Sequence, residues 1–120
     1  MYLCFITLNS EEMELNELDK AAIERLISYM NENCLEPFDI KKHASVIYFS
    51  TSKLNKVFKI YMGVGPGSYY KRIRLQKAKE LMRQEQLTWT EVSGMIGYAD
   101  LPSFSKAFKR TFGYSPKQIS

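Results

Sequence analysis

A nine-residue pattern, F-K-x-x-x-G-x-x-P, occurs twice in this chain and limits its fold more than any other feature. The first copy spans residues 58–66 and the second spans residues 108–116, an offset of 50 positions. An internal repeat of this kind favours two similar lobes over one continuous core. With 120 residues available each lobe is small, and we predict them at residues 16–65 and 85–120.

The residues between the two copies predict a long helix that joins the lobes. Pro66 suits the first turn of a helix, and the run to Gln84, PGSYYKRIRLQKAKELMRQ, is rich in good helix formers. Its apolar or small residues recur at helical spacing: Tyr69, Tyr70, Ile73, Ala78, Leu81 and Met82. At ~1.5 Å per residue this connector of 19 residues (66–84) would be ~28 Å long, close to the ~34 Å between successive major grooves on one side of B-DNA.

Three helices are expected in the first lobe. The first runs from about Glu17 to Asn33, and its apolar face is formed by Leu18, Ala22, Ile23, Leu26, Ile27 and Met30. Asp39 is a suitable N-cap for a short second helix, and Ser50 is one for a third helix that ends near Gly63. Two short helices joined by a tight turn are typical of a helix-turn-helix motif.

The second lobe repeats this order with different capping residues. Thr88 and Glu91 match a capping box, and Asp100 is an N-cap for the next helix, which ends at Gly113. A last short helix is expected to open at Ser115. The predicted fold class is therefore all-α, with two helix-turn-helix lobes, a long linker helix and about seven helices.

Two positions differ between the lobes. Tyr48 stands in the turn where the second lobe has Gly97, which suggests a less strained first turn. His43 corresponds to Val92 on an inward face, so we interpret it as a core or boundary residue in preference to a ligand or a base. The many aromatic residues recur at helical spacing, and we interpret them as core in preference to a base-stacking platform.

Basic residues are concentrated in the part of the chain that contains the repeat. Residues 1–40 carry two basic and nine acidic side chains, whereas residues 41–120 carry 15 basic and four acidic ones. A cationic surface of this density predicts a polyanionic partner, either nucleic acid or an anionic membrane. No stretch approaches ~18 consecutive apolar residues, and the charges of the connector surround Ile73 and Ala78, so nucleic acid is favoured over a membrane.

The sequence lacks the side chains that catalysis or metal binding would need. It contains one histidine and two cysteines, Cys4 and Cys34, without a C-x-x-C pair. We therefore expect no catalytic residue, no metal and no cofactor, and a reducing cytoplasm as the location. The apolar run Tyr2–Leu8 is too short for a signal peptide and resembles a strand fragment, so we assign residues 1–15 to a linker or to the remnant of a preceding domain.

Candidate DNA contacts lie on the outer faces of the third helix and of its counterpart in the second lobe. If Leu54, Val57 and Phe58 face the core, the opposite face carries Ser52, Asn55, Lys56 and Lys59. The matching outer positions in the second lobe are Pro102, Ser103, Lys106, Lys109 and Arg110. Asparagine suits adenine, and lysine suits guanine or phosphate, although single exposed lysines are often only solvated. Phosphate contacts are expected from Ser50, Lys53, Lys59, Lys109 and Arg110.

From about Phe38 to Ser120 the chain resembles the DNA-binding domain of AraC/XylS-type bacterial transcription regulators. The resemblance rests on the runs STSKLNKVFKIYMGVGP, YYKRIRLQKA and IGYADLPSFSKAFKRTFGYSP. It implies a two-lobe domain of seven helices, in which the third and sixth helices each enter a major groove of double-stranded DNA. Under this resemblance the base-reading residues are Ser52, Asn55, Lys56, Pro102, Ser103 and Lys106.

The resemblance also implies an asymmetry between the lobes and further partners. Tyr48 and His43 depart from family positions that are usually glycine and apolar, and the sixth helix carries small or non-polar residues where bases are read. Base recognition is therefore expected mainly from the first lobe, with backbone contacts and DNA bending from the second. RNA polymerase and a sensor or receiver domain outside this chain are candidate partners. The alternative is a protein-interaction module that docks on a regulator or on RNA polymerase through the acidic first helix and the strand-like N-terminus, without reading DNA.

Overall fold

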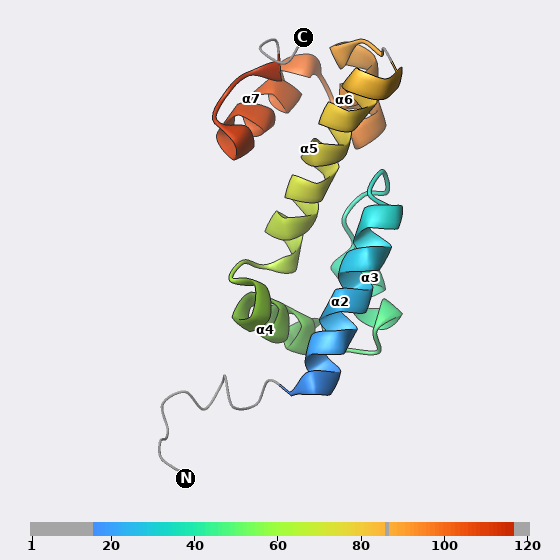
Figure 1. The fold of residues 1–120 in the computed structure, drawn as a ribbon, viewed down its shortest axis with the longest axis vertical. Helices are drawn as coiled ribbons and strands as arrows, with labels where there is room; N and C mark the ends of the chain where they lie inside the picture. The colour runs from blue at the N-terminus through green and yellow to red at the C-terminus, as the bar shows by residue number, and fades with distance from the viewer. Residues whose placement is uncertain (1–15, 86, 117–120) are drawn as a thin grey trace. The chain divides into compact units, whose positions relative to one another are not determined.

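The computed structural model describes residues 16–85 and 87–116, and these residues form six α-helices and no β-strand (Figure 1). The helices are α2 (Glu17–Glu32), α3 (Ile40–Val46), α4 (Thr51–Met62), α5 (Pro66–Glu85), α6 (Trp89–Ile96) and α7 (Leu101–Phe112). The pairs α3/α4 and α6/α7 pack together as helix-turn-helix motifs, which confirms the predicted all-α fold with two such lobes. The expected N-terminal strand fragment, the linker assignment of residues 1–15 and most of the expected last helix fall on residues that the structure does not describe.

Contacts within the chain divide it into two units. In the described residues, the first unit comprises residues 16–30 and 39–69, and the second comprises residues 31–38 and 70–116. Helix α5 is continuous over 20 residues, so it begins in the first unit and continues in the second. From Tyr70 onward the predicted connector is therefore part of the fold of the second unit.

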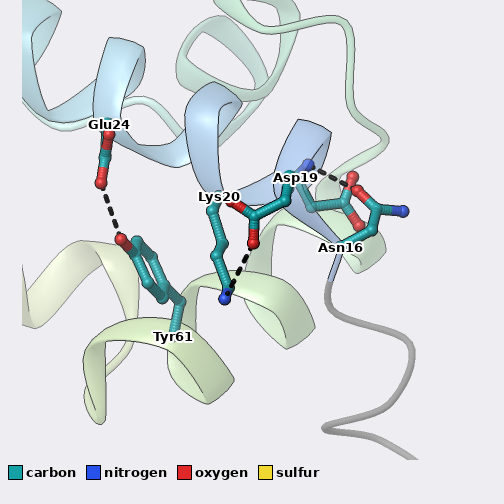
Figure 2. A network of polar contacts seen from close by, with 6 residues as sticks. Asn16, Asp19, Lys20, Glu24 and Tyr61 are labelled. Carbon is teal, nitrogen blue, oxygen red and sulfur yellow. Dashed lines mark hydrogen bonds and ion pairs between the residues drawn. The ribbon is translucent and has the colours of Figure 1, made fainter.

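Asn16 directly precedes helix α2, and its side-chain oxygen Oδ1 accepts a hydrogen bond of 2.8 Å from the backbone N–H of Asp19 (Figure 2). Its buried face is formed by Asp19, Ala22, Ile23, Leu26 and Met30. The prediction that Leu18 belongs to this face is wrong, because Leu18 is 80% exposed. On a helix of 3.6 residues per turn Leu18 lies about 100° from the centre of the buried face, and Asp19 takes the inward position instead.

Side chains of α2 and α4 also meet at a polar contact in the first unit. The Tyr61 hydroxyl donates a hydrogen bond of 2.7 Å to the Glu24 carboxylate (Figure 2). This bond, together with the negative charge of Glu24, raises the pKa of Tyr61 above its usual value. Leu54, Val57 and Phe58 are buried on the inner face of α4, as predicted.

The turn between α3 and α4 has the same geometry as the turn between α6 and α7. In the first turn the N–H of Phe49 bonds the carbonyl of Ala44 at 2.9 Å, and in the second the N–H of Tyr98 bonds the carbonyl of Ser93 at 2.9 Å. Tyr48 has φ 61° and Gly97 has φ 96°, so both occupy the left-handed region. The expectation of a less strained first turn is therefore wrong, since Tyr48 adopts the backbone conformation that favours glycine.

We predict that Tyr48→Gly raises the free energy of unfolding by about 0.5 to 1 kcal/mol. The left-handed conformation costs a residue with a Cβ about 1–2 kcal/mol, and the greater freedom of glycine in the unfolded chain offsets part of the gain. The Tyr48 side chain is 93% exposed, so its removal sacrifices little packing. Tyr48→Ala is the matched control, because it removes the ring and keeps the Cβ. Urea denaturation that gives the two variants equal stability would contradict strain at this position.

The second unit has an apolar core made by α5, α6 and α7. Its buried members are Leu75, Ala78, Val92, Ile96, Phe104, Ala107 and Phe108. Aromatic rings surround Phe108, with the Phe112 centroid at 4.7 Å, the Tyr114 centroid at 5.7 Å and the Trp89 centroid at 5.8 Å. These rings pack against one another, which confirms that they belong to the core.

Two side chains of α5 hold the segment that follows α2 in the second unit. The Tyr70 hydroxyl donates to the carbonyl oxygens of Asn33 and Glu36. The Nε of Arg74 donates to the carbonyl of Cys34 at 2.9 Å. These partners are more than 30 positions apart in the sequence, which explains why no local pattern indicated the contacts.

Candidate nucleic-acid interface

Helix α4 presents the candidate DNA contacts of the first unit on its solvent face. The Ser50 side-chain oxygen accepts from the backbone N–H of Lys53 at 3.1 Å and so fixes where the helix begins. Gly63, with φ 84°, ends the helix in the left-handed conformation. With the inner face buried, four of the predicted contact residues share the exposed side: Ser52, Asn55, Lys56 and Lys59.

Helix α7 repeats this arrangement in the second unit. The Asp100 carboxylate accepts from the backbone N–H of Ser103 at 2.8 Å, and Gly113, with φ 86°, ends the helix. Phe104, Ala107 and Phe108 are buried. All five predicted contact residues of this helix are exposed: Pro102, Ser103, Lys106, Lys109 and Arg110.

The first turns of α4 and α7 differ in charge. The N-cap of α4 is the neutral Ser50, whereas the N-cap of α7 is Asp100. The hydrogen bond from the Ser103 amide lowers the pKa of Asp100, so this carboxylate is ionised at neutral pH. A carboxylate offsets the positive end of the helix dipole, which leaves α4 as the more favourable neighbour for a phosphate.

Lys53, a predicted phosphate contact, has partners inside the first unit. Its Nζ lies 3.4 Å from Oδ1 of Asp19 and 4.4 Å from the centroid of the Phe49 ring. Asp19 is buried, so removing the lysine would leave a desolvated carboxylate without its counter-ion. The sequence did not indicate this pair, because Asp19 and Lys53 belong to different helices.

His43 is a core residue, as the sequence suggested. It is 3% exposed, and its Nδ1 lies 2.8 Å from the carbonyl oxygen of Asp39, one turn earlier. Because a carbonyl can only accept, Nδ1 carries the proton of this bond. The Tyr29 ring meets the imidazole edge to face at a centroid distance of 5.9 Å. These contacts fix the start of α3 against α2.

Among residues 16–85 and 87–116, no three His, Cys, Asp or Glu side chains lie close enough together to hold a metal ion. None of the described helices combines the length and the apolar character that crossing a membrane requires.

A basic row on α5 was not recognised from the sequence as a separate surface. It consists of Arg72, Gln76, Lys79 and Arg83, which follow one another at helical spacing on one side of the helix. The spacing of these residues is visible in the sequence, but the apolar positions of α5 indicate only a helix that connects the two lobes. We call this row the basic stripe.

Two helix-turn-helix motifs, each with an exposed basic helix, define the protein as a DNA-binding helix-turn-helix protein. The family model described as a helix-turn-helix domain matches residues 43–120. The chain belongs to the AraC-type family of these domains, which is a family of transcriptional regulators and not of enzymes.

Three relatives illustrate the similarity. The HTH-type transcriptional regulator GbdR of Pseudomonas aeruginosa is 30% identical over 95 residues, which are 79% of this chain and 26% of GbdR. The F1 operon positive regulatory protein of Yersinia pestis is 35% identical over 103 residues, 84% of this chain and 34% of that protein. The crystal structure of an AraC-type regulator from Chromobacterium violaceum superposes with a TM-score of 0.79 at 26% identity and covers 87% of this chain and 93% of that chain. The chain thus spans about a quarter to a third of these two curated relatives.

Proposed function

We propose that this chain binds double-stranded DNA in a sequence-specific manner, with α4 and α7 in successive major grooves, and so regulates bacterial transcription. The observation that carries the proposal is the duplicated placement of exposed lysines on two helices of equal length. Lys56 and Lys59 of α4 correspond to Lys106 and Lys109 of α7, and all four are exposed. Solvated surface lysines have no reason to recur at matching positions of two motifs, whereas two groove-binding helices need them there.

The side chains of α4 suit direct base recognition. We propose that Asn55 bonds the edge of an adenine, that Lys56 bonds a guanine, and that Ser52 contributes a further contact. In α7 the corresponding roles fall to Ser103 and Lys106, beside Pro102, whose side chain has neither donor nor acceptor. The first unit would then supply most of the discrimination between sequences.

Phosphate contacts are assigned to residues at the edges of the same helices. We propose Ser50, Lys59, Lys109 and Arg110, all exposed, as the main contributors. Lys53 contributes less in this scheme, because its charge is already paired with Asp19 at 3.4 Å.

Protein partners are proposed from the similarity to longer regulators and not from a feature of the described surface. The two curated relatives above are regulatory proteins, and this chain matches only 26% and 34% of their length. We propose that the domain acts in the cytoplasm together with RNA polymerase and with a sensor or receiver domain.

Asn55→Ala should weaken binding to the preferred duplex by about 1–3 kcal/mol and leave binding to random duplexes nearly unchanged. The preferred duplex is first selected from a random pool with the unaltered protein. Gln84→Ala is the matched control, since Gln84 is an exposed amide near the end of α5. Equal losses on preferred and random DNA would show that Asn55 does not read bases. If the selection enriches no sequence, the proposal of sequence-specific binding is wrong.

A further inference from the structure

The basic stripe of α5 meets the C-terminal end of α7 at an aromatic ring. The Nζ of Lys79 lies 4.5 Å from the centroid of the Phe112 ring and 5.7 Å from that of Tyr114. The guanidinium carbon of Arg72 lies 5.7 Å from the Phe112 centroid. Two cations of the same helix therefore contact one ring.

A third cation stands beside this pair. Lys109 precedes Phe112 by three residues on α7, so the two side chains are neighbours on the helix surface, and Lys109 is exposed. The buried face of α7 is formed by Phe104, Ala107 and Phe108, and Phe112 lies at its edge on the side of Lys109. The exposed basic face of α7 thus continues through Lys109 and past Phe112 onto α5.

The stripe extends this charge along α5. Arg72, Gln76, Lys79 and Arg83 lie within about 60° of one another around the helix and span ~16 Å along it. Glu80, the acidic residue within this span, lies about 100° away from Lys79 around the helix axis. Lys79 and Arg83, at spacing i and i+4, are like charges that destabilise a free helix.

Within residues 16–85 and 87–116, the structure shows no ion pair for Arg72, Lys79 or Arg83. Three cations that repel one another, two of them oriented by an aromatic ring, form a surface complementary to a row of anions. In a purely local role, Arg72 and Lys79 would only cover Phe112 and offset the helix dipole at the end of α7. That role does not account for Arg83, a full turn beyond Lys79.

We propose that the basic stripe binds backbone phosphates of the duplex next to the site that α7 occupies. This inference rests on the proposed function and adds a second phosphate-binding element to the second unit. The stripe would add affinity without sequence preference, because it contains cations and one amide and would contact only the backbone. It also gives the second unit, whose α7 has few base-reading groups, a means of holding DNA.

The test compares two double variants with the same change in net charge. Arg72→Gln combined with Lys79→Gln removes two cations of the stripe. Lys71→Gln combined with Lys77→Gln removes two cations of α5 that lie outside it. Salt dependence of binding is measured for both on the preferred duplex and on a random one, because each phosphate contact contributes about −0.9 to the slope of log K against log salt.

The stripe variant should reduce the steepness of that slope by about 2 and weaken binding roughly 10- to 60-fold at 0.1 M salt, to the same extent on both duplexes. The control should change the slope by clearly less. Equal changes of slope in the two double variants would show that only the net charge matters, which would overturn the proposal. An unchanged slope in the stripe variant would overturn it as well.

Arg83→Gln tests the stripe with a change that should not disturb the fold, because Arg83 makes no cation contact with Phe112. This variant should make the slope of log K against log salt less steep by about 1, and its Tm should be unchanged. An unchanged slope here would overturn the extension of the stripe beyond Lys79. If binding by the unaltered protein does not depend steeply on salt, the proposed function itself is wrong. If the unaltered protein shows the steep dependence but the stripe variants have the same slope as the control, only the proposal about the stripe is wrong.

Discussion

Raising the salt concentration from 50 to 200 mM should weaken binding to the preferred duplex by about 250- to 4,000-fold. This range follows from ~5 to 7 phosphate contacts, which give a slope of log K against log salt of about −4 to −6. Three cations of α4 and α7 that we assign to phosphates are exposed: Lys59, Lys109 and Arg110. Arg72, Lys79 and Arg83 of the basic stripe would bring the total to six.

Fluorescence anisotropy with a labelled duplex measures the slope directly. The thermal unfolding midpoint over the same salt range is the control, because screening could also change the stability of the fold. A slope shallower than −1 on the preferred duplex would exclude the DNA-binding mechanism. A protein-interaction module that docks through the acidic surface of α2 would show such a shallow dependence on DNA, and it would then become the leading hypothesis.

The helices were predictable from the sequence because their signals are local. Asp39, Ser50 and Asp100 were identified as N-caps, and each accepts the expected backbone hydrogen bond. The capping box of Thr88 and Glu91 is present in full. Each of these interactions joins residues at most three positions apart, so composition and spacing are sufficient to find it.

The contacts that the sequence did not reveal join residues from different helices. Arg74 reaches the carbonyl of Cys34 across 40 positions, and Lys53 pairs with Asp19 between two helices. Charged residues at such positions look the same in the sequence as solvated ones. The exposed residues of α4 were therefore predicted correctly. Only the structure shows that Lys53 is paired with Asp19 and is less available to a phosphate.

Tyr48 illustrates a different limit of sequence reasoning. A non-glycine residue at this position suggests from the sequence that the turn needs no left-handed residue. The hydrogen bonds of the turn nevertheless impose that conformation on Tyr48. The packing of α3 against α4 outweighs the local preference of Tyr48.

The spacing between half-sites should matter as much as their sequence. Tethering two binding elements raises affinity ~10²–10⁴-fold when both can bind at once, and the gain is lost when geometry forbids it. Helix α5 runs without a break from the first unit into the second, so we expect it to act as a rigid spacer between them. Inserting about 5 base pairs between the half-sites rotates one of them by half a turn, and affinity should fall to that of a duplex with a single half-site. An insertion of about 10 base pairs should leave affinity low, because a rigid spacer cannot lengthen.

A proline in α5 provides the matching change in the protein. Ala78 is unsuitable, because it is fully buried in the core of the second unit and its replacement would unfold that unit. Lys71 is exposed and directly follows Tyr70, where α5 enters the second unit. Lys71→Pro removes a helix hydrogen bond and kinks the helix, at a cost of about 3 kcal/mol, so it should reduce affinity for the uninterrupted site to the level of one half-site.

Lys71→Ala controls for the lost charge, and circular dichroism tests whether the proline variant remains folded. The decisive comparison is affinity and footprint over insertions of 0, 5 and 10 base pairs for all three proteins. A rigid α5 predicts that the unaltered protein and Lys71→Ala lose affinity at 5 base pairs, and that Lys71→Pro is weak at every spacing. Near-equal affinity of the unaltered protein at 0 and 5 base pairs would mean that the two units bind independently, and the rigid-spacer mechanism would have to be abandoned.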